Sequence, residues 1–100
     1  MEITNKNVFI TGSTRGIGLA IAHHFAANGA NLVLNGRSDI TSELIGEFDQ
    51  YDVQVIGISG DVSDAEDAKR MIQEATEALG SVDVLINNAG ITADKLMLKM

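Results

Sequence analysis

The chain has 100 residues, of which 45% are hydrophobic and only 4% are aromatic. This length predicts one compact domain over residues 1–100, with a core of aliphatic side chains. The formal net charge of −7 speaks against nucleic acid or an anionic membrane surface as a partner, because phosphate groups are bound through clustered Lys and Arg. The chain has no cysteine, which excludes disulfides, thiolate metal sites and a thiol nucleophile.

The sequence carries no recognisable targeting or membrane segment. The N-terminal residues lack a basic region followed by a long apolar stretch, so they do not resemble a signal peptide. No apolar run approaches the ~20 residues that a membrane-spanning helix needs. We therefore expect a cytoplasmic protein.

The first half of the chain predicts strands and helices in alternation. Residues 8–10 form an apolar run that indicates a strand, and residues 16–27 have helical periodicity. One apolar face of that helix is expected to comprise Ile17, Ala20, Ile21 and Phe25. Gly29 is expected to end the helix before a second strand over residues 32–34. A shorter helix follows, with its apolar positions at Leu44, Ile45 and Phe48.

The second half predicts two more strands, over residues 53–58 and 84–86. Between them, Ser63 and Glu66 have the spacing of a capping box, in which Ser63 accepts from a free N–H and Glu66 reaches back. The helix that follows is expected to end at Gly80. Its apolar stripe, which we interpret as core, comprises Ala68, Met71, Ile72, Ala75, Ala78 and Leu79. The Met-rich last ten residues are expected to begin another helix.

Short strands that are apolar throughout are typical of a parallel sheet with helices on both faces. The alternation of strands and helices along the chain favours right-handed crossovers between neighbouring parallel strands. The sequence therefore predicts an α/β fold, a Rossmann-type doubly wound parallel sheet of four strands with intervening helices.

A glycine pattern stands between the first expected strand and the first expected helix. Gly12, Gly16 and Gly18 have the spacing Gly-x-x-x-Gly-x-Gly. The first glycine would allow a tight turn, the second would let the backbone approach a pyrophosphate, and the third would permit close packing of the helix. The helix N-terminus would offer free N–H groups and its positive dipole end to the phosphates. The alternative is a glycine-rich turn without a ligand.

The end of the second strand bears on the choice of dinucleotide. NAD-binding domains place an acid about twenty residues after the glycines, whereas NADP-binding domains use a nearby arginine. Here the strand ends in Asn35, Gly36 and Arg37, without an acid. Arg37 and Arg15 can meet a 2′-phosphate with charge-assisted hydrogen bonds, so we expect NADP(H). The alternative is that both arginines are solvated surface charges.

Polar residues also follow the third and the fourth strand. Asp61 and Val62 can bind an adenine edge through a carboxylate and a backbone N–H; alternatively, Asp61 helps to cap the next helix. The Asn-Asn-Ala-Gly turn at residues 87–90 can hold adjacent strands together and line a ribose, although by itself it is an ordinary turn. His23 and His24 are interpreted as surface or half-buried helix residues. No group of residues has metal-ligand spacing, so no metal site is expected.

Together these motifs resemble the short-chain dehydrogenase/reductase family over essentially the whole chain. The glycine pattern, the Asp61-Val62 pair and the turn at 87–90 stand in the order and at the spacing of that family. The resemblance implies a set of cofactor-binding residues, namely Gly12, Ser13, Thr14, Arg15, Gly16, Ile17, Gly18, Arg37, Asp61, Val62, Asn88, Ala89 and Gly90. Residues 90–100 are similar to the segment that follows this turn in 3-oxoacyl-(acyl-carrier-protein) reductases.

The resemblance also implies that the catalytic residues lie further along than this chain extends. The family uses a Ser, a Tyr-x-x-x-Lys pair and a supporting Asn, all beyond the turn at 87–90. The single tyrosine here, Tyr51, has Val55 rather than Lys four positions on. We therefore assign no catalytic residue. We expect the chain to be the N-terminal part of a longer reductase, with an incomplete sheet and no activity alone.

For the intact protein, the resemblance implies NADPH-dependent reduction of a 3-oxoacyl-(acyl-carrier-protein) in fatty acid synthesis. It also implies assembly into a homo-oligomer, a tetramer. A short-chain reductase of another keto substrate is an alternative. If the chain acts alone, it is either a non-catalytic module that senses or stores NADP(H), or an interaction fragment that associates through an open strand edge and its apolar tail.

Overall fold

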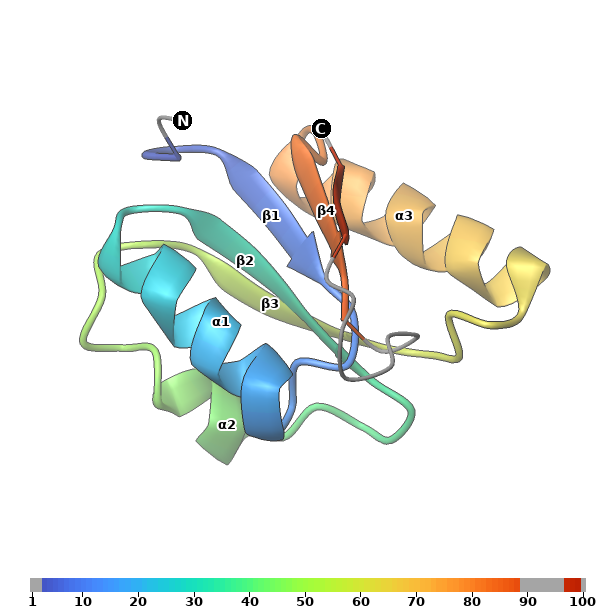
Figure 1. Ribbon diagram of the computed structural model, residues 1–100, viewed down its shortest axis with the longest axis horizontal. Helices are drawn as coiled ribbons and strands as arrows, with labels where there is room; N and C mark the ends of the chain where they lie inside the picture. The colour runs from blue at the N-terminus through green and yellow to red at the C-terminus, as the bar shows by residue number, and fades with distance from the viewer. Residues whose placement is uncertain (1–2, 89–96, 100) are drawn as a thin grey trace.

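The computed structural model describes residues 3–88 and 97–99. In these ranges the strands are β1 (Asn7–Ile10), β2 (Asn31–Gly36), β3 (Val55–Ser59), β4 (Val84–Asn87) and β5 (Met97–Lys99). They form one sheet in the order β3-β2-β1-β4-β5, in which all neighbours are parallel except β4 and β5 (Figure 1). The four expected parallel strands are thus confirmed, and their ends differ from the predicted ones by at most two residues.

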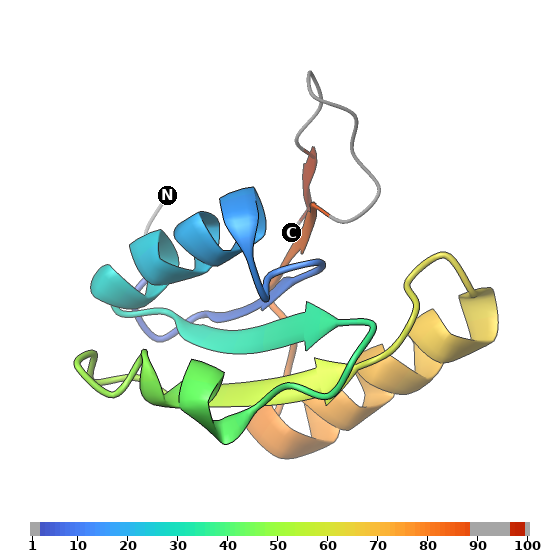
Figure 2. The same cartoon turned by 90° about the horizontal axis from the view of Figure 1, so that it is seen from below.

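The helices α1 (Gly16–Ala27), α2 (Ser42–Gly46) and α3 (Ala65–Leu79) cover the two faces of the sheet. α1 and α2 contribute to the core on one face, and α3 lies on the other (Figures 1 and 2). The chain runs outward from β1 through β2 to β3, then returns to the opposite side of β1 to form β4. The strand order therefore reverses beside β1. In doubly wound sheets ligands bind outside the carboxyl ends of the strands at such a reversal.

Alternate residues of each parallel strand enter the two halves of the core. Val8 and Ile10 of β1 belong to the cluster under α1 and α2, whereas Phe9 packs with Met71 and Ala75 of α3. All of β1 is buried, because it is a central strand with helices on both sides. This arrangement explains why Val8, Phe9 and Ile10 are apolar in succession.

The predicted apolar face of α1 is confirmed for Ile21 and Phe25, which are half-buried against the core, and wrong for Ile17 and Ala20, which are exposed. Ile17 is 70% exposed, and the buried positions of the helix are Gly18, Ala22 and Ala26. α1 lies so close to its neighbours that a Cβ atom on Gly18 would stand 2.2 Å from the carbonyl oxygen of Gly12. Small residues must therefore form the contact line of the helix, and the larger apolar side chains flank it.

The expectation of a helix in the last ten residues is also wrong for its described part. Met97–Lys99 forms β5, which pairs with β4. An edge strand presents unpaired backbone N–H and C=O groups, and an extended segment can satisfy them where a helix cannot. Residues 89–96 and 100 lie outside the described residues.

Candidate cofactor site

A cleft of about 1090 Å³ lies at the carboxyl edge of the parallel strands. Figure 2 shows the strand arrowheads at the edge where α1 and α3 begin. Of the residues predicted from the sequence, the cleft is lined by Gly12, Thr14, Arg15, Gly16, Arg37, Asp61, Val62 and Asn88. Segments that are far apart in the chain thus contribute to one concave surface. Ala89 and Gly90 lie outside the described residues.

The three glycines of the first loop meet backbone requirements. Gly12 and Gly16 have φ angles of 61° and 62°, in the left-handed region that side chains disfavour. Gly18 has no room for a side chain, because its Cβ would also lie 2.6 Å from the Nδ2 atom of Asn88. The pattern therefore shapes a turn that brings the start of α1 against the ends of β1 and β4.

Within residues 3–88 and 97–99, no side chain accepts a hydrogen bond from the first N–H groups of α1. Its N-cap residue, Arg15, makes no capping hydrogen bond, and the first turn contains no acid. The first N–H groups of a helix have no partner within the helix, and they carry the positive end of the helix dipole. Since Arg15 and Gly16 line the cleft, α1 presents a site suited to an anion.

The N-terminus of α3 differs, and the predicted capping box is wrong. Asp64, not Ser63, caps α3: its Oδ1 atom accepts hydrogen bonds from the backbone N–H groups of Glu66 at 3.0 Å and Asp67 at 3.3 Å. Glu66 and Asp67 add negative charge to the first turn. This helix start is therefore already neutralised by the protein, so of the two long helices in the described part of the chain α1 is the one suited to phosphate.

Ser13 shapes the glycine loop from inside the fold. It is fully buried, its Oγ donates to the Ile10 carbonyl at 2.8 Å, and the same Oγ accepts from the backbone N–H of Asn35 at 2.8 Å. Its own backbone N–H donates to the Asn35 carbonyl at 2.8 Å. The hydroxyl of Ser13 is therefore directed into the protein and away from the cleft.

The end of β2 is crowded at position 36 by a side chain of the glycine loop. A Cβ atom on Gly36 would lie 2.8 Å from the Cγ2 atom of Thr14 in the glycine loop. Arg37, the next residue, is exposed and lines the cleft together with Arg15. The rim at this point is therefore basic, with the methyl group of Thr14 packed where a side chain at 36 would begin.

Asp61 is held in place by the residue that precedes the capping position. Its Oδ1 atom accepts from the hydroxyl of Ser63 at 2.7 Å and from the backbone N–H of Ser63 at 3.0 Å. These two hydrogen bonds hold the pKa of Asp61 below its ordinary value, and the charge of Arg37 acts in the same direction. In this structure Asp61 orders its own loop, and the capping of α3 falls to Asp64.

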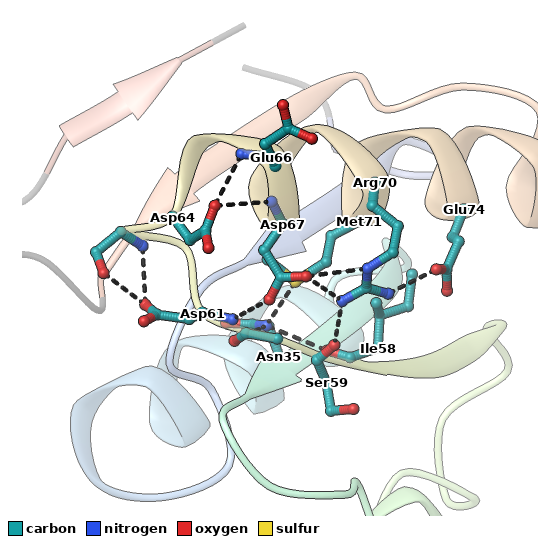
Figure 3. Close-up of polar contacts among 12 residues, drawn as sticks. Asn35, Ile58, Ser59, Asp61, Asp64, Glu66, Asp67, Arg70, Met71 and Glu74 are labelled. Atoms are coloured by element: carbon teal, nitrogen blue, oxygen red, sulfur yellow. Dashed lines mark hydrogen bonds and ion pairs between the residues drawn. The ribbon is translucent and has the colours of Figure 1, made fainter.

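The loop after β3 is also tied to α3. The backbone N–H of Asp61 donates to Oδ2 of Asp67 at 2.8 Å, and Arg70 donates to both Asp67 and the Ser59 carbonyl, as Figure 3 shows. Glu74 accepts from Arg70 at 2.6 Å on the side away from the loop. The first turns of α3 therefore fix the backbone that carries Asp61 into the cleft.

The end of β4 closes onto the glycine loop. Nδ2 of Asn88 donates to the Gly12 carbonyl at 3.0 Å, and the hydroxyl of Thr11 donates to Oδ1 of Asn87 at 3.3 Å. The two asparagines therefore join β4 to β1 at the edge of the sheet where the cleft lies. This is more than an ordinary turn would do, and it fits the expectation that these side chains hold adjacent strands together.

The histidines lie away from the cleft. His23 is half-buried and stacks on Phe48 with ring centres 4.3 Å apart, and its Nδ1 lies 2.9 Å from the hydroxyl oxygen of Tyr51. His24 is exposed. Within residues 3–88 and 97–99, no group of three His, Cys, Asp or Glu residues is arranged to hold a metal ion. In the same ranges no helix has the length and apolar character needed to cross a membrane.

Sequence reasoning assigned no role to Asn35, a buried residue that supports the cleft from behind. It is 2% exposed, and its side chain contacts both the glycine loop and the end of β3. The signal was present as a polar residue at the end of a run of buried aliphatic residues. Its partners could not be named without the strand order, which places β2 between β1 and β3.

Known proteins are similar to this chain in sequence and in architecture. The sequence pattern of the short chain dehydrogenase family matches residues 6–100. The 3-oxoacyl-(acyl-carrier-protein) reductase of Staphylococcus epidermidis is 40% identical over 98 residues, which cover 96% of this chain and 40% of that protein. The chain thus spans less than half the length of this relative.

Two solved structures have the same arrangement of strands and helices. A 3-oxoacyl-(acyl-carrier protein) reductase from Brucella melitensis in complex with NAD matches with a TM-score of 0.81 and 29% identity, over 92% of this chain and 36% of that chain. A blue fluorescent protein from a metagenomic library in complex with NADPH matches with a TM-score of 0.77 and 32% identity, over 91% of this chain and 38% of that chain. With its glycine loop, its strand order and its sequence pattern, the chain belongs to the short chain dehydrogenase family.

Proposed function

We propose that this chain is the cofactor-binding part of an NADPH-dependent carbonyl reductase. The observation that carries the proposal is the start of α1, which has no side-chain cap and no acid and faces the cleft between Arg15 and Arg37. A dinucleotide has a pyrophosphate that suits the helix N-terminus, and NADPH has a further phosphate that suits the arginines. The nicotinamide would supply hydride to a carbonyl group.

The elements around the cleft suit the successive parts of the cofactor. The loop from Gly12 to Gly18 would hold the pyrophosphate, with Ser13 contributing through the shape of the loop. Asp61 and Val62 would contact the adenine, and Asn88 with the residues that follow it, Ala89 and Gly90, would lie along the ribose. Ile17 is exposed on the first turn of α1, where it would contact the cofactor by an apolar face.

The preference for NADPH over NADH rests on the rim at the end of β2. Arg37 and Arg15 carry positive charge at the cleft, and Thr14 crowds position 36, where an acid would repel the 2′-phosphate. Related proteins have been seen with either nucleotide, one with NADPH and one with NAD. Family membership alone therefore does not determine which nucleotide binds. We attribute the choice to the residues at the rim of the cleft.

The substrate we propose is a 3-oxoacyl thioester carried on acyl carrier protein, as in fatty acid synthesis. Support comes from the name of the Staphylococcus epidermidis relative and from the similarity of residues 90–100 to that subgroup. We further propose that the intact protein is a cytoplasmic homo-oligomer. Assays of the intact protein with NADPH should show reduction of 3-oxoacyl thioesters; reduction of a different carbonyl class alone would refute this substrate.

A titration of the chain with NADPH and NADH, followed by nicotinamide fluorescence, tests the choice of cofactor. We expect NADPH to bind more tightly, and Arg37→Ala to weaken NADPH about tenfold with little effect on NADH, because only NADPH has the 2′-phosphate. Lys69→Ala removes an equal charge from the exposed face of α3 and should change neither affinity. Equal affinity for the two nucleotides would contradict the assignment of NADPH.

A further inference from the structure

Asn35 is a polar side chain in a buried place. It follows Leu32, Val33 and Leu34 of β2, each of which is fully buried, and it is itself 2% exposed. An amide in such surroundings destabilises the fold unless its N–H and C=O groups find partners. The surrounding residues must therefore supply hydrogen-bond partners for this amide.

The amide of Asn35 joins two loops. Its Oδ1 accepts from the backbone N–H of Gly12 at 3.1 Å. Its Nδ2 donates to the carbonyl of Ile58 at 3.1 Å and lies 3.4 Å from that of Gly60. An N–H on one side and carbonyls on the other fix which way the amide points, since each partner needs the opposite group.

These two loops are the ones that carry the pyrophosphate and adenine contacts of the proposed function. Gly12 begins the turn that leads into α1, and Gly60 directly precedes Asp61. Figure 3 shows Asn35 beside Ile58 and below Asp61. β2 lies between β1 and β3 in the sheet, so a side chain from its carboxyl end can reach the ends of both neighbours.

We propose that Asn35 is a positioning residue that couples the pyrophosphate-binding loop to the adenine-binding loop without touching the cofactor. The inference rests on the proposed function for the identity of the ligand. The Oδ1 atom holds the Gly12 turn, so that the N–H groups at the start of α1 face the cleft. The Nδ2 group holds the end of β3, so that Asp61 and Val62 face the same cleft.

β2 provides a matched control at its other end. The side chain of Asn31 also links both neighbouring strands: its Nδ2 donates to Oδ1 of Asn7 at 2.9 Å, and its Oδ1 accepts from the backbone N–H of Gln54 at 3.0 Å. Asn31 stands at the amino end of β2, at the edge of the sheet opposite the cleft. Equivalent substitutions at 31 and 35 therefore disturb similar contacts, and only those at 35 lie next to the cofactor loops.

The test compares Asn35→Asp and Asn31→Asp in the chain, with NADPH and inorganic pyrophosphate as probes. Aspartate keeps the acceptor and loses the donor, so Asn35→Asp should retain the bond to Gly12 and lose those to Ile58 and Gly60. We expect the affinity of this variant for NADPH to fall about tenfold more than its affinity for pyrophosphate, because the added charge acts on both anionic probes and only NADPH contacts the loop after β3. Asn31→Asp should lower the thermal midpoint and leave both affinities as they are.

A second variant guards against a failure of Asn35→Asp to fold. Asn35→Ala removes both bonds without burying a charge, and it should weaken both NADPH and pyrophosphate. Its amide hydrogen exchange, measured without ligand, should be about tenfold or more faster at Gly12 and unchanged at Val33. Unchanged affinities together with unchanged exchange at Gly12 would overturn the proposal.

The outcomes separate this inference from the proposed function. If the unmodified chain binds neither NADPH nor NADH, the proposed cofactor is wrong, and exchange at Gly12 still decides whether Asn35 holds the loop. If the unmodified chain binds NADPH and the variants at 31 and 35 lose affinity equally, the loss is one of general stability and the coupling role of Asn35 is refuted.

Discussion

Gly18 shows how a single position constrains both the fold and the site. Its missing side chain lets the first turn of α1 lie against the carbonyl of Gly12 and the amide of Asn88. Gly46 is also helical and exposed, but the nearest atom to its Cβ would be a carboxylate oxygen of Asp49 at 3.9 Å, an ordinary contact. The same residue type therefore has a required role at one position and none at the other.

Substitution by alanine should have opposite effects at these two glycines. Gly18→Ala forces a backbone shift, and we expect it to lower the free energy of unfolding by roughly 1–3 kcal/mol and to weaken NADPH. Gly46→Ala reduces the freedom of the unfolded chain and should raise that free energy by about 0.5 kcal/mol. Urea unfolding of both variants measures the difference. If Gly18→Ala left the free energy of unfolding unchanged, α1 would be able to move away from β1 without loss of stability.

The two long helices that begin at the cleft, α1 and α3, differ in how their N-termini are satisfied. α3 is capped by Asp64, and its first turns hold the loop after β3 through Asp67 and Arg70. α1 begins at Arg15 without a cap. A helix N-terminus without a capping side chain lowers the stability of the protein. A ligand offsets this loss when it supplies hydrogen-bond acceptors to the free N–H groups. The start of α1 is thus suited to an anionic ligand, whereas the start of α3 supports the neighbouring loop.

This division predicts a conflict between stability and binding at Arg15. Arg15→Asn and Arg15→Ala both remove the charge, but only asparagine can accept a hydrogen bond from the N–H groups of the first turn. The extended backbone of Arg15, with φ −161° and ψ 169°, suits a capping residue. We expect the free energy of unfolding of Arg15→Asn to exceed that of Arg15→Ala by about 1 kcal/mol. We also expect Arg15→Asn to bind NADPH several-fold more weakly than Arg15→Ala does, because its side chain occupies the N–H groups that the phosphates would use. Thermal unfolding and fluorescence titration measure the two effects, and tighter binding by Arg15→Asn would contradict them.

For the molecule as a whole, the acidic loop network makes folding depend on pH. Hydrogen bonds from the Asp61 amide and from Arg70 hold the pKa of Asp67 below its ordinary value of 3.8. A carboxylate whose pKa is lowered by folding stabilises the folded state above its ordinary pKa. That stabilisation is lost as the pH falls below 3.8 and through the lowered pKa of the folded state.

Asp67→Asn should therefore reduce the loss of stability that accompanies acidification below about pH 4. The exposed Glu77 lies on the same helix, and Glu77→Gln serves as a control of equal charge that should leave the acid profile close to that of the unmodified chain. Urea unfolding at a series of pH values measures both. Identical profiles for Asp67→Asn and the unmodified chain would show that the network contributes nothing to the pH dependence.

Much of this molecule could be predicted from its sequence, because the relevant forces act locally. Apolar runs predict the four parallel strands, and the glycine spacing predicts the turn into α1. The predictions that failed depend on distances between elements. The exposed Ile17 reflects how closely α1 approaches its neighbours, and the use of Asp64 over Ser63 as the cap reflects how the preceding loop is tied to α3. The role of Asn35 requires knowledge of which strands flank β2.

The pairing of β4 with β1, after β2 and β3 in the chain, has a consequence for biosynthesis. The carbonyl of Gly12 meets the amide of Asn88, which follows it by 76 positions. While the chain leaves the ribosome, the glycine loop and the ends of β2 and β3 emerge long before β4, so the nascent chain lacks one wall of the cleft. We therefore expect the cleft to be complete only after Asn88 has emerged and β4 has joined the sheet.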